Sequence, residues 1–227
     1  AVDLILIDGG INDVSVNEIV SPFADSDLVA LVNQHCYNDM KELLKEVTKN
    51  FKNAKIIVTG YYQIVSAESD LSALTAMLVV LGLVAGAAVG GAVGGVVGGV
   101  IGAVISVTER DKMVRRSAIF ATEAEKKLAL AVQETNINLG TPRVCFANPA
   151  FGPANAIFAS DPWIYGINWD LSPEDNPPTG VAPTRSDACE TAGSSRTNVD
   201  ICKRASMGHP NVLGAKEYAR VIREMLP

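Results

Sequence analysis

Three short segments of the chain are almost entirely apolar and are bounded by polar residues or glycine. They span residues 2–7 (VDLILI), 54–61 (AKIIVTGY) and 143–147 (RVCFA). Short runs rich in Ile, Val and Leu are typical of strands that are buried on both faces of a parallel sheet. We therefore predict three strands, and we expect the first to be an interior strand, because an edge strand would leave backbone groups unpaired.

Three longer segments place apolar residues at helical spacing and charged residues on the opposite face. They span residues 27–51, 109–136 and 211–225, and Asn211 is the expected N-cap of the last. The residues predicted to face inward are Leu28, Leu31, Val32, Met40, Leu43, Leu44, Val47 and Phe51 in the first helix, Val114, Ala118, Ala121, Leu128 and Val132 in the second, and Ala215, Tyr218, Ile222 and Met225 in the third.

Strands that alternate with helices favour an α/β fold with a parallel sheet covered on both faces, which is a three-layer α/β/α sandwich. The expected order is strand, helix, strand, insertion, helix, strand, long loop, helix. A chain of 227 residues is long enough for one sizeable core. We therefore expect a single domain over residues 1–227, with an apolar, glycine-rich insertion at 68–108.

The insertion has an unusual composition, because residues 71–108 contain no charged side chain. Glycine recurs there at every fourth position, a pattern that allows helices to approach closely and is common in lipid. The stretch is also longer than the ~20 residues that span a bilayer. Two interpretations stay open: a glycine zipper that packs within the domain or between copies of the chain, and one that contacts a membrane. The glycines are Gly82, Gly86, Gly90, Gly94, Gly98 and Gly102.

The charge of the chain argues against a nucleic-acid partner. Acidic residues outnumber basic ones by 25 to 19, for a net charge of −6. The sequence has no block of Lys and Arg that would neutralise a run of phosphates.

Two of the four cysteines, Cys189 and Cys202, flank a polar stretch that has too little apolar content to hold itself in place. We predict that they form a disulfide worth about 3 kcal/mol, the alternative being two unpaired thiols. A disulfide favours an oxidising compartment and hence a secreted or cell-surface location. We expect Cys145 and Cys36 to be buried thiols, although a bond from Cys36 to a segment outside the sequence stays open.

Candidate chemistry is expected beyond the carboxyl ends of the strands, where open parallel sheets place their reactive groups. The first strand runs into DGGIND, in which the glycines allow a tight turn and the Asn12 amide can donate to a developing oxyanion. His209 precedes the last helix and is a candidate general base, whereas His35 lies within a helix and is interpreted as structural. Dinucleotide binding is disfavoured because GGIND is not a G-x-G-x-x-G turn.

The two turns resemble motifs of one enzyme family. Gly10-Ile11-Asn12-Asp13 after an apolar strand resembles the G-x-N-D block of SGNH (GDSL-like) hydrolases. His209-Pro210-Asn211, followed by Gly214, Ala215, Tyr218 and Ala219, resembles their terminal H-P-N-x-x-G-x-x-x-Y-A block. Residues 58–66 and 146–166 are also similar to segments of lipase-like actinobacterial members. The resemblance therefore covers nearly the whole chain outside the glycine-rich insertion, and it implies the SGNH-hydrolase variant of a flavodoxin-like sandwich.

The resemblance implies a serine esterase or lipase that needs no metal or cofactor and acts on lipid or other acyl esters. His209 would be the general base, and Asn12, with Gly10 in the same block, would form part of the oxyanion hole. The G-D-S block with the nucleophilic serine is absent from the sequence, so we expect an N-terminal fragment to supply it. The position of the family's D-x-x-H acid is Ser206, which leaves a Ser-His dyad or orientation of His209 by a backbone carbonyl, Ser206 or Asp200.

A second hypothesis is a catalytically inactive membrane-binding or self-assembling protein. Its working part would be the glycine zipper, with contacts to a membrane or to other copies of the chain through Gly82 to Gly102.

Trp163 and Trp169 would line an acyl pocket in the enzyme hypothesis, although loop tryptophans more often serve simple packing.

Overall fold

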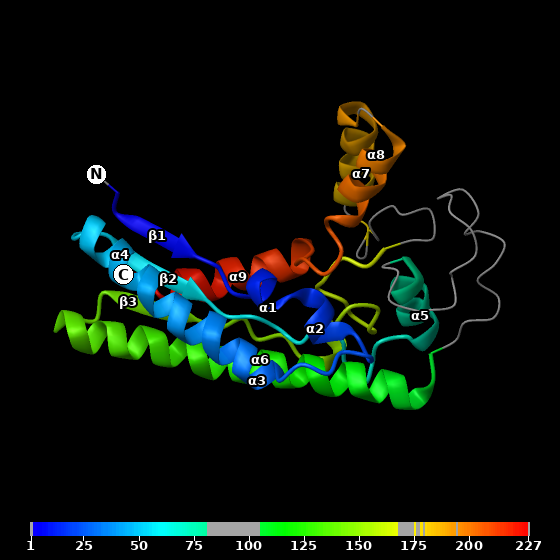
Figure 1. Cartoon of the computed structure of the whole chain (residues 1–227). Coiled ribbons are helices and arrows are strands. Elements are labelled where there is room, and N and C mark those ends of the chain that lie inside the picture. Colours follow the sequence, from blue (N-terminus) through cyan, green and yellow to red (C-terminus); the bar gives the residue numbers. More distant parts are fainter. Residues whose placement is uncertain are drawn as a thin grey trace.

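A three-stranded parallel sheet lies at the centre of the fold. The computed structural model describes residues 2–80, 105–167, 175, 178, 180–193 and 195–226. Strands β1 (Leu4–Ile7), β2 (Lys55–Thr59) and β3 (Val144–Ala147) pair in the order β1-β2-β3 (Figure 1). The three predicted strands and their parallel arrangement are confirmed.

Helices surround the sheet in the order expected for a mixed α/β protein (Figure 1). The helical elements of the described chain are α1 (Ile11–Val14), α2 (Val16–Val20), α3 (Leu28–Val32), a π-helical turn (Asn33–Asp39), α4 (Met40–Asn50), α5 (Leu71–Val80), α6 (Val107–Leu139), a 3-10 turn (Pro153–Asn155), α7 (Val181–Ala192), α8 (Arg196–Arg204) and α9 (Val212–Glu224).

Successive side chains of β2 point to opposite faces of the sheet, so the core has one part on each face. Ile56 and Val58 belong to the larger core, to which α4 and α6 contribute. Ile57 packs with Ala147 and with Val221 of α9. Helices therefore cover both faces of the sheet, at least at β2 and β3.

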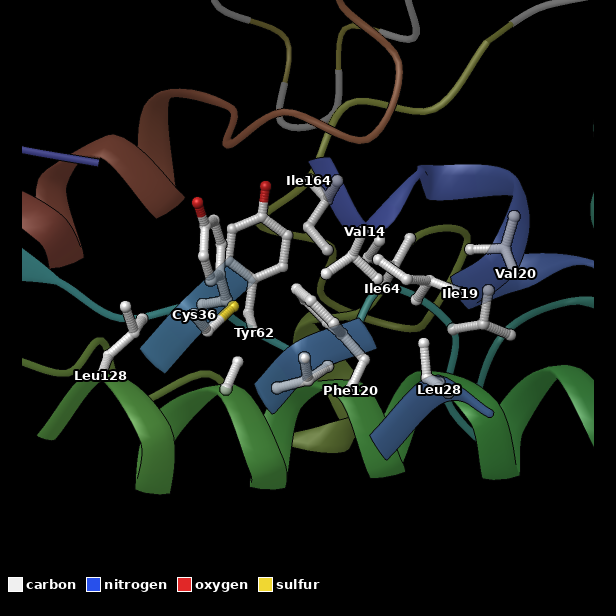
Figure 2. Close-up of a cluster of buried hydrophobic side chains, with 14 of the residues drawn as sticks. Val14, Ile19, Val20, Leu28, Cys36, Tyr62, Ile64, Phe120, Leu128 and Ile164 are labelled. Atoms are coloured by element: carbon white, nitrogen blue, oxygen red, sulfur yellow. The ribbon is translucent and has the colours of Figure 1, made fainter. Parts of the chain in front are cut away.

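The long helix α6 buries Leu128 and Val132 as predicted, but the other buried residues differ from the predicted ones. It begins with a capping box formed by Ser106 and Glu109. Val114, Ala118 and Ala121 are only half-buried, and Ser117 is fully buried. Figure 2 shows Phe120 and Leu128 of this helix among the side chains of the core. The buried residues are Met113, Ser117, Phe120, Ala124, Leu128, Ala131, Val132 and Thr135.

The polar residue Ser117 lies on the buried face of α6 because its hydroxyl group is a hydrogen-bond acceptor for buried backbone groups. The hydroxyl oxygen of Ser117 accepts hydrogen bonds from the backbone N–H groups of Ile64 (2.8 Å) and Val65 (3.0 Å). Both donors belong to the segment after β2 and would otherwise be buried without partners. Periodicity of apolar residues cannot reveal this contact.

The predicted helix at 27–51 consists of α3, the π-helical turn and α4. Of its predicted inward residues, Leu28, Val32, Met40 and Leu44 are buried, whereas Leu43 and Phe51 are exposed. A π-helical turn contains extra residues per turn and shifts the phase of the helix on its C-terminal side. The prediction was therefore wrong for Leu43 and Phe51, whereas Met40 and Leu44 face inward as predicted.

The last helix, α9, is capped by Asn211 as predicted, since its side-chain oxygen accepts from the N–H groups of Leu213 and Gly214. Ala215, predicted to face inward, is exposed, and Gly214, Glu217 and Val221 are buried instead. Glu217 tolerates burial because its carboxylate accepts from Ala150 N–H and pairs with Arg220.

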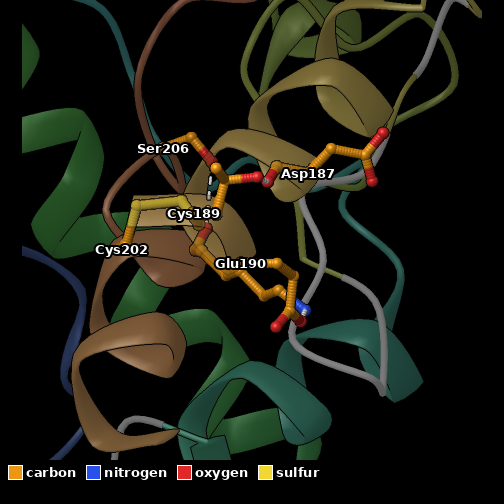
Figure 3. Close-up of a disulfide and its surroundings, with 7 residues drawn as sticks. Asp187, Cys189, Glu190, Cys202 and Ser206 are labelled. Atoms are coloured by element: carbon orange, nitrogen blue, oxygen red, sulfur yellow. Dashed lines mark hydrogen bonds and ion pairs between the residues drawn. A yellow bond between two sulfur atoms is a disulfide. The ribbon is translucent and has the colours of Figure 1, made fainter. Parts of the chain in front are cut away.

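The polar stretch before His209 is helical, so the predicted long loop was wrong there. Helices α7 and α8 form a hairpin that stands away from the sheet (Figure 1). The predicted disulfide between Cys189 and Cys202 is present and joins them, with a Cα–Cα distance of 5.7 Å (Figure 3). The hairpin is tight because Gly193 approaches Val199 so closely that a Cβ atom would lie 2.2 Å from it.

Strand β1 lies at the edge of the described sheet, contrary to the interior position predicted for it. Two of its apolar side chains face solvent, Leu4 at 39% and Leu6 at 52% exposed, and Val2, just before the strand, is 47% exposed. Alternation places all three on the side of the sheet that α9 covers at β2 and β3. Within the described residues, the sheet thus ends in an apolar strip with an unpaired backbone edge.

The predicted glycine zipper, Gly82 to Gly102, lies outside the described residues. Within the described chain, no helix is long and apolar enough to cross a membrane.

Candidate functional site

The turn after β1 is shaped by glycine. Gly10 adopts φ of 119°, which L residues rarely do, and a Cβ atom there would lie 2.9 Å from the Cys36 sulfur. The Gly10 carbonyl accepts from Val14 N–H at 2.9 Å, which closes α1. Asn12 lies in this single turn of helix and is exposed. Burial, and to a smaller degree Asp13, raise the pKa of the Cys36 thiol to about 12, so this cysteine stays protonated.

Tyr61 connects this turn to the segment after β2. Its hydroxyl oxygen accepts a hydrogen bond from Ile11 N–H at 3.2 Å. Its ring is buried and contacts the Phe120 ring, with 5.5 Å between centroids. The start of α1, and with it Asn12, is therefore held against a rigid part of the core.

The His209 turn is held by backbone pairing with residues 163–165. Tyr165 N–H donates to the His209 carbonyl (2.8 Å), and Gly208 N–H donates to the Tyr165 carbonyl (2.9 Å). Pro210 bridges to Ile164 in antiparallel fashion. Gly208 supplies the positive φ of 80° that the turn requires. The His209 side chain is exposed at the end of this rigid turn.

Tyr62 connects the His209 turn to the same segment after β2. Its hydroxyl donates to the Gly208 carbonyl at 2.7 Å, and its ring stacks on Phe151 with 4.6 Å between centroids. The Tyr62 ring lies within the buried cluster (Figure 2). Two adjacent tyrosines thus hold the two motif turns, one each, at the same carboxyl edge of the sheet.

Sequence reasoning did not assign these tyrosines a role. They lie in VTGYYQIVS, a segment that contributes to the family resemblance but whose single residues were given no role. The available signal was a pair of aromatic hydroxyl residues directly after a buried strand, where such groups reach functional loops.

Asp8 is an additional acidic residue at this edge. Part of its side chain reaches solvent, but the protein around its carboxyl group raises the pKa above the usual value by burial. The Tyr61 hydroxyl and the charge of His209 act in the opposite direction and lower this pKa.

The candidates for orienting His209 lie in or before its turn. The Ser206 hydroxyl donates to the Lys203 carbonyl at 3.2 Å, while the Ser206 carbonyl accepts from the backbone N–H of His209 at 3.1 Å. Ser206 thus contacts the backbone of His209. Asp200 lies on α8, and its side chain is outside the described part.

Asn12 and His209 have side chains that are available to a ligand. Neither side chain makes a hydrogen bond within the part of the chain that the structure describes. Among the described residues, no group of His, Cys, Asp and Glu has the arrangement of a metal site. Two hollows on the described surface are lined by residues of α4, α6 and the loop after α6, and neither of them includes a motif turn.

His35, interpreted as structural, has a partner that the sequence did not reveal. Its Nδ1 atom lies 2.8 Å from a carboxylate oxygen of Asp39, the last residue of the π-helical turn. The pair is an i,i+4 contact on one helical surface.

Trp163 packs in a cluster of rings. It contacts Phe151 edge to face at 5.2 Å, and its indole N–H donates to Asp161 at 3.3 Å. Trp163 therefore takes part in ring packing, and Trp169 lies outside the described residues.

Comparisons with known proteins add no family to this description. No protein-family model, curated protein or solved structure matches the chain. Fold and site define a mixed α/β protein with a small parallel sheet, in which each of the two motif turns is bonded to a tyrosine that follows β2.

Proposed function

We propose that the chain is the larger part of an SGNH-type ester hydrolase whose nucleophilic serine lies on a segment outside these 227 residues. The observation that carries the proposal is the common attachment of the Asn12 and His209 turns to Tyr61 and Tyr62. Turns from opposite ends of a chain need such a link if their side chains are to act on one substrate.

The open edge of β1 supports the proposal that the serine lies on a segment outside these 227 residues. Natural sheets rarely leave a hydrophobic edge strand uncovered, and Val2, Leu4 and Leu6 are exposed here. A parallel strand beside β1 would cover this edge, and it would place its own carboxyl end next to the turn that holds Asn12. A serine at that end would lie where the reaction needs it. The complete fold is then a three-layer α/β/α sandwich.

The reaction would be acyl transfer to serine. His209 accepts the serine proton while the serine oxygen bonds to the ester carbonyl carbon, and the electron pair moves onto the carbonyl oxygen, toward which Asn12 donates. When the carbonyl re-forms, the bond to the alcohol oxygen breaks and His209 protonates the departing alcohol. Water repeats the cycle and releases the carboxylic acid. Lipid or other acyl esters are the proposed substrates, and the disulfide favours a secreted or cell-surface location.

The test is fluorophosphonate labelling of the purified native material, followed by intact mass measurement under denaturing conditions. We expect the label on a G-D-S-like serine of a segment that accompanies this chain. His209→Gln should abolish labelling, Asn12→Ala should reduce ester hydrolysis by about 10²- to 10³-fold, and His35→Gln should change neither. A single unlabelled species would contradict the proposal and favour a non-catalytic membrane-binding or self-assembling protein.

A further inference from the structure

Buried side chains recur at every fourth position between residues 28 and 48. An α-helix has about 3.6 residues per turn, so each step of four residues carries the next side chain about 40° further around the axis. From the first of these residues to the last, the accumulated rotation in a straight α-helix is about 200°, which would place them on opposite sides. All of them are nevertheless buried: Leu28, Val32, Cys36, Met40, Leu44 and Thr48.

The π-helical turn (Asn33–Asp39) removes part of this rotation, and Cys36 is its middle residue. A π-helix turns through a smaller angle per residue than an α-helix, because its hydrogen bonds join residues that are five apart. Side chains on the exposed side follow the same spacing, since the Gln34 amide donates to the carboxylate of Asp39, five residues later, at 2.7 Å. The turn therefore keeps Cys36 on the buried face of the segment.

Cys36 is the residue at which the π-helical turn meets the turn that carries Asn12. A Cβ atom on Gly10 would lie 2.9 Å from the Cys36 sulfur, 3.7 Å from the His35 carbonyl oxygen and 3.8 Å from the Cys36 Cα atom. The backbone of Gly10 thus packs directly on the π-helical turn, and Cys36 itself lies within the buried cluster (Figure 2). Because the Gly10 carbonyl accepts from Val14 N–H to close α1, the placement of the π-helical turn sets the position of Asn12.

Both supports of α1 lead back to the same helix, α6. In the first, the Tyr37 hydroxyl of the π-helical turn donates to the two carboxylate oxygens of Glu134, each at 2.8 Å, and Lys41 pairs with the same carboxylate at 2.5 Å. In the second, Tyr61, whose hydroxyl accepts from the N–H group at the start of α1, contacts Phe120 of α6. The short helix is therefore fixed by two contacts that share one long, well-packed element.

The C-terminal end of α1 is constrained as well. Ser15, which follows α1, has φ of 76°, a conformation that residues with a Cβ atom rarely adopt. Such a backbone costs free energy and persists only where the surrounding structure imposes it. The Ser15 N–H group donates to the Asn12 carbonyl at 3.2 Å, so the strained residue is bonded to Asn12 itself.

We propose that the π-helical turn is a positioning element for Asn12 and that Cys36 is the residue through which it acts. The role of Cys36 is one of size and shape, because its thiol is buried and free and its sulfur lies against Gly10. The catalytic meaning of this position, donation toward an oxyanion, rests on the proposed function. The mechanical link from the π-helical turn to Asn12 does not.

The test removes one residue from the π-helical turn. Gln34 is exposed, and its deletion allows a regular α-helix to hold the remaining buried side chains on one face. The fold should persist by circular dichroism, whereas the side-chain amide signal of Asn12, assigned by its loss in Asn12→Ala, should shift in ¹H–¹⁵N NMR spectra. Gln34→Ala is the matched control, because it removes the same side chain and keeps the residue count, and it should leave the Asn12 signal in place. The amide of Asn155, bonded to Asp161, should be unchanged in both variants.

Cys36→Ala covers the case in which the deletion variant does not fold. It keeps the π-helical backbone and removes the contact of the sulfur with Gly10, so it should also shift the Asn12 signal. The proposal is overturned if the Asn12 signal stays in place in the folded deletion variant or in Cys36→Ala, or if Gln34→Ala moves it as far as the deletion does.

Fluorophosphonate labelling of the native material separates this proposal from the proposed function. Displacement of Asn12 should slow labelling by about 10-fold in Cys36→Ala and by more in the deletion variant, while Gln34→Ala should label at the unmodified rate. A shifted Asn12 signal without labelling of the unmodified protein would uphold the positioning role and reject the hydrolase. Labelling of the unmodified protein with an Asn12 signal that neither the deletion nor Cys36→Ala moves would uphold the hydrolase and overturn the positioning role.

Discussion

The hydroxyl of Tyr62 donates a hydrogen bond of 2.7 Å to the backbone carbonyl of Gly208, 146 residues later in the chain. The ring that carries this hydroxyl is stacked on Phe151 and is buried, so it has little freedom to move. The residue after Gly208 is the proposed base, and the position of that base therefore depends on a side chain that follows β2.

Replacing Tyr62 with Phe keeps the ring stack and removes this bond. We expect the free energy of unfolding to fall by about 1 kcal/mol in urea titrations, and the NMR signals of His209 to shift. Tyr61→Phe is the matched comparison, since it should shift Asn12 instead. If His209 signals are unchanged in Tyr62→Phe, the hydroxyl does not hold the turn.

Ser117→Ala should be costly although it removes a single oxygen atom. The N–H groups of Ile64 and Val65 would lose their shared acceptor inside the protein. We expect a loss of about 2–4 kcal/mol in the free energy of unfolding, measured by chemical denaturation. Ser72→Ala, on the exposed side of α5, should change it by less than about 0.5 kcal/mol. Equal effects of the two substitutions would refute this role of Ser117.

Gly214→Ala tests the close approach of α9 to the segment before Tyr165. A Cβ atom there would lie 2.3 Å from the Trp163 carbonyl oxygen. We expect a loss of about 1–3 kcal/mol in thermal or urea unfolding, despite the higher helix propensity of alanine. Ala215→Gly, at the exposed neighbouring position, should lower stability by no more than about 1 kcal/mol. A stabilised Gly214→Ala variant would show that α9 can move away.

Reduction of the disulfide should act locally on the α7–α8 hairpin. A Cys189→Ser, Cys202→Ser double variant loses the constraint that closes a short loop, worth about 3 kcal/mol in the chain-entropy account. We expect faster hydrogen exchange of α7 and α8 amides, while β2 and α6 keep their protection. Cys145→Ala is the control, because its thiol is free. Uniform loss of protection would indicate that the hairpin stabilises the whole fold.

The pH dependence of stability should have opposite signs for two carboxyl groups. The pKa of Asp8 is raised by burial in the folded protein, so its contribution to stability is lost as pH rises through that raised pKa. Asp8→Asn should therefore increase the melting temperature at neutral pH, with a difference that shrinks below the usual Asp range. Calorimetry at several pH values measures the increase in melting temperature at neutral pH and its decrease toward acidic pH.

Glu217 provides the contrast, because Arg220 and the Ala150 N–H lower its pKa. The contribution of Glu217 to stability is present above the usual pKa range of Glu, and it is lost as pH falls through the lowered pKa. Glu217→Gln should decrease the melting temperature at neutral pH and have little effect at acidic pH.

A lower melting temperature for Asp8→Asn at neutral pH would contradict the assignment of Asp8 as a residue held at a cost in stability.

Much of the local structure could be predicted because its causes are local. Runs such as KIIVT specify a buried strand, Asn211 caps a helix by bonding to amides two and three residues ahead, and Cys189 lies near Cys202 because few residues separate them. The glycine turn before Asn12 follows from the same kind of reasoning, since the φ of Gly10 suits a residue without a Cβ atom.

The sequence by itself determined the strands, the main helices, the disulfide and the two turns that carry Asn12 and His209. Tertiary structure decided which face of α6 is buried, because Ser117 is buried by what it binds and not by its own polarity. It also decided that β1 is the edge of the described sheet, and it brought Tyr61 and Tyr62 to the two turns. These relationships depend on contacts between segments that are distant along the chain, and apolar periodicity carries no information about such contacts.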